Sequence, residues 1–451
     1  MRSLPPDVHR GERPEETKYA EARSIVIKRA SQRRSPGWGP LIVAVGTITA
    51  VLALGTSAAP AAASADSAAG PQTAQAAAIA QIVRSAMQTN SLKAVIVKVT
   101  KGNHVVGEQA FGSSLAGVPA TPAMHFRNGA VAFAYIGTLL LKFVEKHKVN
   151  LNDTIERWEP TLPEANQVTL KMLTNQTSGY PDFETDPGWT AAFNTDPFQS
   201  WTYQSRIAYA FDRPLQFAPA ANWSYAHTNF MILGDILAKI GKQPLDVLLR
   251  DKVLKPMGLT QTTATETGAI PDPVLHAFSS ERRVTLGIPP TGPFYEESTF
   301  WNADWGTPVG ANETTTIDDM AKTAISVGTG QLLSKSSYHA MTDSNLIGFG
   351  QKQANCVPSC FTQQVGYNYG LGVVRSGSWI LQNPQVGGYS ATEAYLPSQK
   401  ISISVATTFL PAAFDCNGVY PNSSDTVFRA IGHYLAPSDS PPPAPIQPKT
   451  C

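Results

Sequence analysis

The segment Phe126-Arg127-Asn128-Gly129-Ala130-Val131-Ala132-Phe133 leads into a long apolar stretch that ends at Lys146. Between Ala130 and Lys146 apolar residues occupy every face of a helix, and such a helix is normally buried inside a domain. We therefore expect residues 130–146 to form a long apolar helix.

Strand-like segments lie on both sides of this helix along the chain. Helical spacing at 79–88 is followed by two short strands joined at the turn Lys101-Gly102-Asn103. After a loop- and proline-rich middle, strand patterns and a closing helix follow at 369–374, 390–396, 401–407 and 426–435. This order predicts an α+β fold, in which one antiparallel sheet combines N- and C-terminal segments and is flanked by helices. The mostly helical middle domain, approximately 150–325, is inserted between them, with its clearest helices at 229–240 and 244–253.

The two ends of the chain differ from this predicted domain, 79–436. A basic stretch, 28–34, precedes an apolar run, 41–54, and small residues at 61–65. Residues 1–65 are thus predicted to be a signal peptide, cleaved after Ala63 or Ala65, or a retained membrane segment if uncleaved. Residues 66–78 are expected to be a flexible linker, and the Pro-rich tail 437–451 is expected not to join a packed element.

Composition excludes several functions. The 451 residues carry a formal net charge of +1, so no global field favours nucleic acid or an anionic membrane. The common nucleotide and metal motifs are absent, and we expect no cofactor and no metal. The four cysteines suggest disulfides outside the cytoplasm. Cys356 and Cys360 could close a short loop, leaving Cys416 to reach Cys451, although spacing alone does not fix the pairing.

Six segments in order resemble those of one family. From about 80 to 435 the chain is similar to class C β-lactamases, D-alanyl-D-alanine carboxypeptidases and related esterases, in the segments 126–133, 141–154, 173–182, 223–234, 369–372 and 388–390. The resemblance implies a β-lactamase/transpeptidase-like fold. It also implies a nucleophilic serine with a lysine one helical turn later, where the lysine takes the proton of the serine.

The chain departs from the family at these catalytic positions. Ala130 and Phe133 stand where the serine and lysine belong, so neither a nucleophile nor a base is present there. Replacing both partners by apolar groups avoids leaving an unpaired buried charge. The family's lysine- or histidine-containing strand motif corresponds to Gln382-Asn383-Pro384. We therefore expect the cleft to include Gln382, Asn383, Gly388 and Tyr389.

Part of the family's second motif persists. Tyr225 occupies the place of the catalytic tyrosine, His227 replaces an asparagine, and Gln176 replaces a common histidine. Tyr225 and His227 could form a remnant acid/base pair, but a packed Tyr225 ring with its hydroxyl bonded to backbone is the favoured interpretation.

Two further groups have a functional and a structural interpretation. Asp182, Glu184 and Asp186 could bind a cation, but solvated carboxylates are favoured. Trp301, Trp305 and Tyr295 could form an aromatic shelf for a substrate, but core packing is favoured.

Three hypotheses about function remain. The preferred one is a catalytically silent family member, secreted or in the cell envelope, that serves as a binding or regulatory module for a peptidoglycan peptide or an envelope protein. The second is an active hydrolase of the esterase, carboxypeptidase or β-lactamase type with a non-standard site around Tyr225 and His227. The third is a structural envelope protein without a ligand. Fold alone does not decide among them.

Overall fold

The computed structural model describes residues 71–343, 345–356, 358–443 and 451, all of which belong to one structural unit. The expected export segment, 1–65, lies outside the described residues. None of the described helices is both long enough and apolar enough to cross a membrane.

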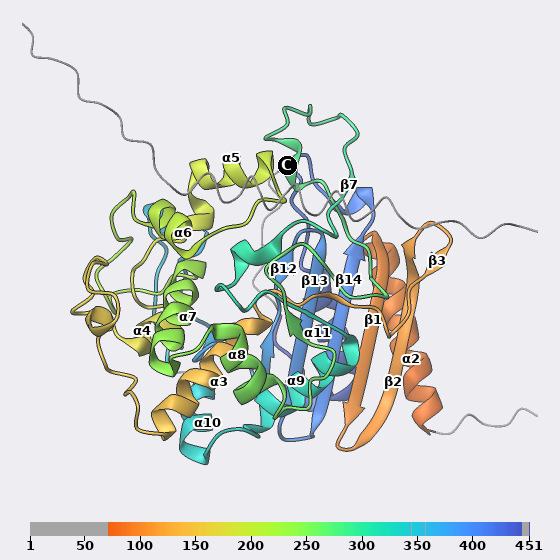
Figure 1. The fold of residues 1–451 in the computed structure, drawn as a ribbon. Helices are drawn as coiled ribbons and strands as arrows, with labels where there is room; N and C mark the ends of the chain where they lie inside the picture. The colour runs from red at the N-terminus through yellow and green to blue at the C-terminus, as the bar shows by residue number, and fades with distance from the viewer. Residues whose placement is uncertain (1–70, 344, 357, 444–450) are drawn as a thin grey trace, which may run out of the picture. The chain divides into compact units, whose positions relative to one another are not determined.

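The main sheet joins the two ends of the domain, as the sequence predicts. All its pairings are antiparallel, and the order is β3-β2-β1-β14-β13-β11-β10-β9 with β12 paired to β13 (Figure 1). Its strands are β1 Leu92–Lys101, β2 His104–Leu115, β3 Val118–Pro119, β9 Asn368–Tyr369, β10 Val374–Ser376, β11 Trp379–Gln382, β12 Gln385–Val386, β13 Tyr389–Leu396 and β14 Ile401–Phe409. The central contact is between β1 and β14, where Val97 lies opposite Val405. The N-terminal hairpin is thereby fixed to the C-terminal strands.

Helices cover both faces of this sheet because the buried side chains of β1 alternate in direction. Val95 and Val97 belong to one apolar core together with α2 Pro71–Thr89 and α11 Ser423–Leu435. Ala94 and Ile96 belong to a second core, together with Ile317 and Met320 of α9 Ile317–Thr329. The sheet is therefore an inner layer between two helical layers.

The helical part of the domain is built around α3 Val131–Glu145, whose residues from Val131 to Leu141 are all buried. At Gly137 an added Cβ would lie 2.4 Å from the carbonyl oxygen of Leu371, so glycine permits the close approach of α3 to the segment between β9 and β10. The other α-helices here are α4 Leu170–Thr174, α5 Pro187–Thr195, α6 Tyr203–Ala210, α7 His227–Gly241, α8 Leu245–Leu249 and α10 Lys335–Thr342.

Short elements connect these parts. Two small antiparallel sheets contain β4 Phe126–Arg127, β8 Glu313–Thr315 and β5 Thr263–Ala264, and β6 Phe278–Ser279 and β7 Glu296–Glu297. The 3₁₀ turns are η1 Ile155–Arg157, η2 Phe183–Thr185, η4 Glu281–Arg283, η5 Ala303–Gly306, η6 Ala354–Cys356, η7 Pro411–Ala413 and η8 Pro437–Asp439, and η3 Arg250–Leu254 is a π-helical turn.

The structure corrects three boundaries. The first helix begins at Pro71, so residues 71–78 of the expected flexible linker are helical. The expected strand 369–374 is divided into β9 and β10, because Gly372 adopts a left-handed φ of 79° between them. Helix α9 begins within the expected helical middle domain, approximately 150–325, but it packs on β13 and β14.

The expectation that the C-terminal tail would not join a packed element is wrong. Pro441 is buried, and the indole nitrogen of Trp379 donates a hydrogen bond to the carbonyl oxygen of Asp439 over 2.8 Å. Arg429 also donates to the carbonyl oxygen of Pro442. A proline-rich segment lacks some backbone donors, but its carbonyls remain acceptors, and side chains of the domain use them here.

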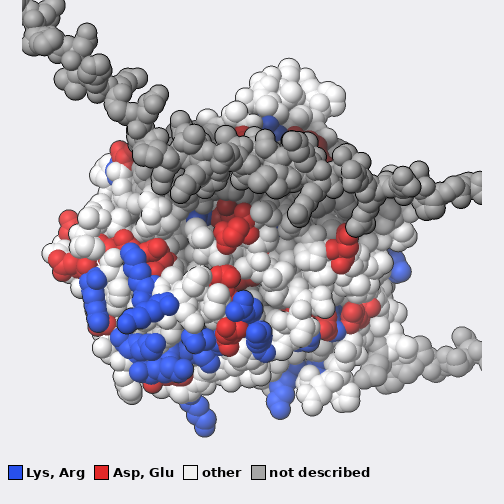
Figure 2. All heavy atoms as spheres, in the orientation of Figure 1, with Lys and Arg blue, Asp and Glu red and all other residues white. Residues whose placement is uncertain are grey.

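Charges of both signs share the visible surface. Figure 2 shows Lys and Arg side chains gathered at the lower left, over the part where Figure 1 places α3, α8 and α10, and acidic side chains in several separate groups. This pattern gives one local basic area within a chain of nearly balanced charge.

Candidate active-site region

The N-terminus of α3 holds the two positions that sequence comparison identifies as catalytic in the resembling family. Ala130 is the N-terminal cap residue of α3 and makes no side-chain capping bond. Phe133 is fully buried, and its ring lies parallel to that of Phe230 of α7, with centroids 3.8 Å apart. A methyl group and a phenyl ring occupy this turn, so it supplies neither a nucleophile nor a proton acceptor.

The expected strand motif lies beside this turn, but its side chains point elsewhere. A Cβ added at Gly129 would lie 3.0 Å from the Cβ of Pro384, which places the proline against the entry to α3. Gln382 donates through Nε2 to the carbonyl oxygen of Gly372 over 2.6 Å, and Asn383 donates through Nδ2 to Oδ1 of Asp425 over 3.2 Å. Both amides are thus used in holding neighbouring segments together.

The other two cleft candidates are also held by backbone contacts. The N–H of Gly388 donates to the Tyr420 hydroxyl over 3.1 Å, and the Tyr389 hydroxyl donates to the carbonyl oxygen of Leu275 over 2.6 Å. The ring of Tyr389 nevertheless borders a small pocket that is also lined by Arg127, Ser298, Thr299, Trp301, Ala303, Trp305, Val386 and Gly387. Of the four residues expected at the cleft, Tyr389 is therefore the one that lines this pocket.

Tyr225 and His227 are brought together with Phe133. The ring of Tyr225 lies 5.0 Å from that of His227, and both lie within 6.3 Å of the Phe133 ring. Burial raises the pKa of Tyr225 well above its usual range, so the phenol stays protonated at neutral pH. Among the described residues, the Tyr225 hydroxyl forms no hydrogen bond. The bond from this hydroxyl to the backbone that the sequence analysis favoured is therefore not formed there.

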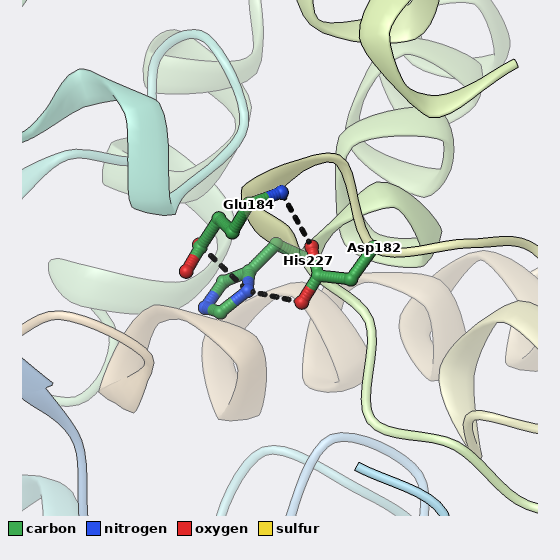
Figure 3. A group of neighbouring side chains, drawn as sticks. All are labelled: Asp182, Glu184 and His227. Carbon is green, nitrogen blue, oxygen red and sulfur yellow. Dashed lines mark hydrogen bonds and ion pairs between the residues drawn. The ribbon is translucent and has the colours of Figure 1, made fainter. Parts of the chain in front are cut away.

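Two acidic residues surround His227, as Figure 3 shows. Its Nδ1 lies 3.0 Å from Oδ2 of Asp182 and 2.6 Å from Oε1 of Glu184. Burial disfavours the imidazolium, but the two carboxylates outweigh it and raise the pKa of His227 to about 10. Burial raises the pKa of Glu184 to about 7. At neutral pH His227 therefore carries its proton already and is a poor general base.

The interpretation of Asp182, Glu184 and Asp186 as solvated carboxylates is wrong, because Asp182 and Asp186 are buried and Glu184 is partly buried. Asp182 is 4% exposed and Glu184 is only partly accessible, whereas Asp186 caps α5 by accepting the N–H of Trp189 over 2.9 Å. The sequence groups the three by proximity along the chain. It gives no sign that the start of α7, some 45 residues later, places His227 against two of them.

Gln176 connects the same loop to α7. Its Oε1 accepts hydrogen bonds from the N–H of Ala226, over 3.1 Å, and from the side-chain amide of Asn229. Ala226 caps α7 and makes no side-chain capping bond of its own, so Gln176 satisfies one of the free donors at this helix end. The residue that replaces the common histidine has a structural role here.

The expected aromatic shelf separates into two parts. Trp301 is buried in a cluster with Trp189, Phe193 and Trp201, as core packing predicts. Trp305 is only partly buried, and its ring lies 6.2 Å from that of His227. Tyr295 belongs elsewhere, because its ring stacks on Phe278 and its hydroxyl donates to the carbonyl oxygen of Phe409.

Disulfides join Cys356 to Cys360 and Cys416 to Cys451, which confirms the pairing that the short loop suggested. The first lies beside the site, since the N–H of Tyr225 donates to the carbonyl oxygen of Ser359 over 3.3 Å. The loop closed by this disulfide thus supports the backbone of Tyr225.

Solved structures show the class of fold. D-amino acid amidase from Ochrobactrum anthropi matches with a TM-score of 0.66 at 20% identity, over 81% of this chain and 100% of that chain. A D-stereospecific amidohydrolase from Streptomyces matches with a TM-score of 0.64 at 20% identity, over 79% and 98%. The fold is β-lactamase/transpeptidase-like.

The family follows from the sequence. The Beta-lactamase family model matches residues 79–418, and the chain belongs to this family. Penicillin-binding protein 4* of Bacillus subtilis is 27% identical over 146 residues, which are 32% of this chain and 31% of the relative. The Escherichia coli D-alanyl-D-alanine-carboxypeptidase/endopeptidase AmpH is 29% identical over 150 residues, 32% and 37% of the two chains. The matched segments thus span about a third of each of these relatives.

Proposed function

We propose that this protein is an exported β-lactamase family member that no longer forms an acyl-enzyme and instead binds a ligand in the cell envelope. The observation that carries the proposal is the pair Ala130 and Phe133, a methyl group and a buried ring at the family's nucleophile and base. Acyl transfer in this family needs an activated hydroxyl, and neither residue can be activated.

The neighbouring groups support a silent site. Tyr225 and His227 are both protonated at neutral pH, because burial raises the pKa of the phenol and the two carboxylates raise that of the imidazole. Pro384, the last residue of the altered strand motif, lacks an N–H and lies against Gly129. Nucleophile, base and strand motif are therefore all altered together.

The ligand we propose is a peptidoglycan peptide. One relative is named a D-alanyl-D-alanine-carboxypeptidase/endopeptidase, and the name of one solved neighbour refers to D-amino acid amides, so peptides ending in D-amino acids are the chemistry to test first. Trp305 is only partly buried, lines a small pocket and lies 6.2 Å from the ring of His227, so it offers one aromatic ring to a peptide bound beside the site. An envelope protein is the other binding partner to consider.

Export is part of the same proposal. The basic, apolar and small-residue segments between residues 28 and 65 have the order of a signal peptide. Two disulfides are typical of proteins that fold outside the cytoplasm.

An active hydrolase is the second candidate, and one contact favours it. Asp182 accepts a hydrogen bond from Nδ1 of His227, as the carboxylate does in catalytic triads, and this contact leaves Nε2 for a substrate or water. Its weakness is the protonation of the imidazole at neutral pH.

A labelling experiment separates the two candidates. The purified protein is treated with fluorescent penicillin and with a fluorophosphonate, beside Tyr225→Phe and His227→Gln variants. We expect no covalent labelling of any form. Labelling that Tyr225→Phe or His227→Gln abolishes would establish the hydrolase instead.

A melting experiment then tests for a ligand. A muropeptide that ends in D-alanine should raise the melting temperature, because a ligand bound only by the folded state stabilises it. The same peptide ending in L-alanine is the matched control. Equal or absent shifts with both peptides would contradict the proposed ligand.

A further inference from the structure

Two carboxylates converge on one imidazole nitrogen at the start of α7. Asp182, Glu184 and His227 each offer one donor atom, and these three atoms lie within 4.8 Å of one another. Figure 3 shows the dashed lines from both carboxylates ending at the same ring nitrogen of His227. Asp182 and Glu184 come from the loop at η2, and His227 is the first residue of α7, so the cluster is assembled by the fold.

The backbone holds these three side chains in place before any ligand binds. The hydroxyl of Thr228, next to His227, donates to the carbonyl oxygen of Pro181 over 2.7 Å and accepts the N–H of Phe183 over 3.1 Å. Oδ1 of Asp182 accepts the N–H of Glu184 over 3.3 Å, which leaves Oδ2 for His227. The loop at η2 and the start of α7 are therefore held together by hydrogen bonds next to the three candidate metal-binding side chains.

The cluster has more acceptors than donors. Nδ1 of His227 can carry one proton, which it donates to Oδ2 of Asp182, while Oε1 of Glu184 lies 2.6 Å from the same Nδ1 and has no other donor among the described residues. Among the described residues, neither carboxylate forms an ion pair with Lys or Arg. The nearby Arg213 donates its hydrogen bonds to the backbone oxygen of Asp182 and to the hydroxyl of Thr185 instead. Two buried carboxylates beside one imidazole thus leave negative charge without a full counter-charge.

We propose that Asp182, Glu184 and His227 bind one divalent transition-metal ion, with Zn²⁺ as the ion best matched to the donor set. One imidazole nitrogen and two carboxylate oxygens are donors that zinc accepts, whereas Mg²⁺ and Ca²⁺ prefer oxygen alone. Zinc ligands at about 2.0–2.2 Å in a tetrahedron lie roughly 3.3 Å apart. The two separations from Nδ1, 3.0 and 2.6 Å, would need to widen by about 0.3 and about 0.7 Å.

The surroundings favour a bound cation. The rings of Tyr225, Phe133 and Trp305 lie 5.0, 5.9 and 6.2 Å from that of His227, and an apolar shell strengthens the attraction between carboxylates and a metal. All four cysteines are in disulfides and do not compete for the ion. This site does not depend on the proposed peptide ligand, and each can fail without the other.

Titration of the purified full chain with Zn²⁺ tests the inference. For this experiment the protein is prepared without a histidine tag, and bound metal ions are first removed with EDTA. We expect one zinc ion bound per chain, a higher melting temperature with Zn²⁺ than with Mg²⁺, and X-ray absorption showing one imidazole among light N and O ligands. Glu184→Gln and Asp182→Asn keep the side-chain shapes and should weaken binding at least about 10-fold.

Asp186→Asn is the matched control, because this carboxylate lies in the same loop but caps α5 outside the cluster. It should bind zinc like the natural protein. If either Glu184→Gln or Asp182→Asn does not fold, the other variant and the X-ray absorption spectrum still test whether zinc binds at this cluster. Absence of stoichiometric binding at 100 µM Zn²⁺, binding unchanged in both cluster variants, or equal binding of Mg²⁺ would each overturn the proposal.

Discussion

The rings of Phe133 and Phe230 lie face to face, with centroids 3.8 Å apart and planes inclined by 2°. This contact joins α3 to α7 at the position where the resembling family has its lysine. A residue that would serve catalysis in a relative is therefore part of the core of this protein.

Phe133→Ala should lower the free energy of unfolding by about 3–5 kcal/mol, because a fully buried ring is replaced by a cavity. Guanidinium denaturation measures the change. Phe198→Ala is the control, since Phe198 is 62% exposed and its loss should cost little. Equal effects of the two variants would show that Phe133 is not packed as described.

Restoring the family residues should not restore acylation. In Ala130→Ser/Phe133→Lys an ammonium is buried where a ring packed, so we expect a lower melting temperature and no reaction with fluorescent penicillin. Pro384 of the altered strand motif would still lie beside Gly129. A covalently labelled band in the double variant would show that these two side chains alone separate the protein from its active relatives.

Protonation of His227 can be observed directly. Since the two carboxylates raise its pKa to about 10, the imidazole nitrogen shifts of His227 should be those of the protonated ring from about pH 6 to pH 8 in metal-free protein, with only a smaller change as the neighbouring Glu184, whose pKa is raised to about 7, titrates. Nuclear magnetic resonance with His227→Gln for assignment gives the titration. Conversion of the ring nitrogen shifts to those of neutral imidazole with a midpoint near pH 6.5 would remove the argument against His227 as a general base.

Asp304 should make stability depend on pH. Burial raises its pKa from 3.8 to about 6, so the folded state binds this proton more tightly than the unfolded state does. The stabilisation that this proton gives the folded state is fully present below about pH 3.8 and is lost as the pH rises to about 6. Above that pH the contribution no longer changes, and the free energy of unfolding has fallen by about 3 kcal/mol in total. Asp304→Asn should therefore gain stability relative to the natural protein over that interval. Asp212→Asn, at an exposed position, should show no such trend.

The two disulfides should differ in their contribution to stability. Cys416–Cys451 closes a loop with a sequence separation of 35, whereas Cys356–Cys360 closes one with a separation of 4. Because a longer loop restricts the unfolded chain more, the two disulfides should contribute about 4 and about 2 kcal/mol, respectively, to the free energy of unfolding. Melting of Cys451→Ser/Cys416→Ser and Cys356→Ser/Cys360→Ser variants measures both. A larger loss for the short loop would contradict the entropic argument.

The elements that depend on local periodicity could be predicted from the sequence. The apolar pattern of α3 and the alternating strands β1 and β14 indicated a sheet built from both ends of the chain, and the structure confirms it. Boundaries set by single glycines or by distant partners could not be predicted. Gly372 divides an expected strand, and the Pro-rich tail packs because Trp379 and Arg429 donate hydrogen bonds to its carbonyl oxygens.

The candidate site was predictable only in part. Motif order located Ala130, Phe133, Tyr225 and His227, which the structure brings together. The contact of His227 with Asp182 and Glu184 depends on how a loop and a helix end meet, and residues about 45 positions apart give no periodic signal for such a meeting. Gln382 and Asn383 were expected at the cleft, but their amides bind Gly372 and Asp425.

The short loop closed by Cys356 and Cys360 accepts the backbone N–H of Tyr225 through Ser359. One wall of the cleft is therefore supported by a covalent bond that reducing agents can break. Thiol-containing buffers used during purification would loosen that wall while the sheet, which contains neither cysteine, kept its pairing. Ligand measurements made with and without reductant would thus compare two differently supported forms of one cleft.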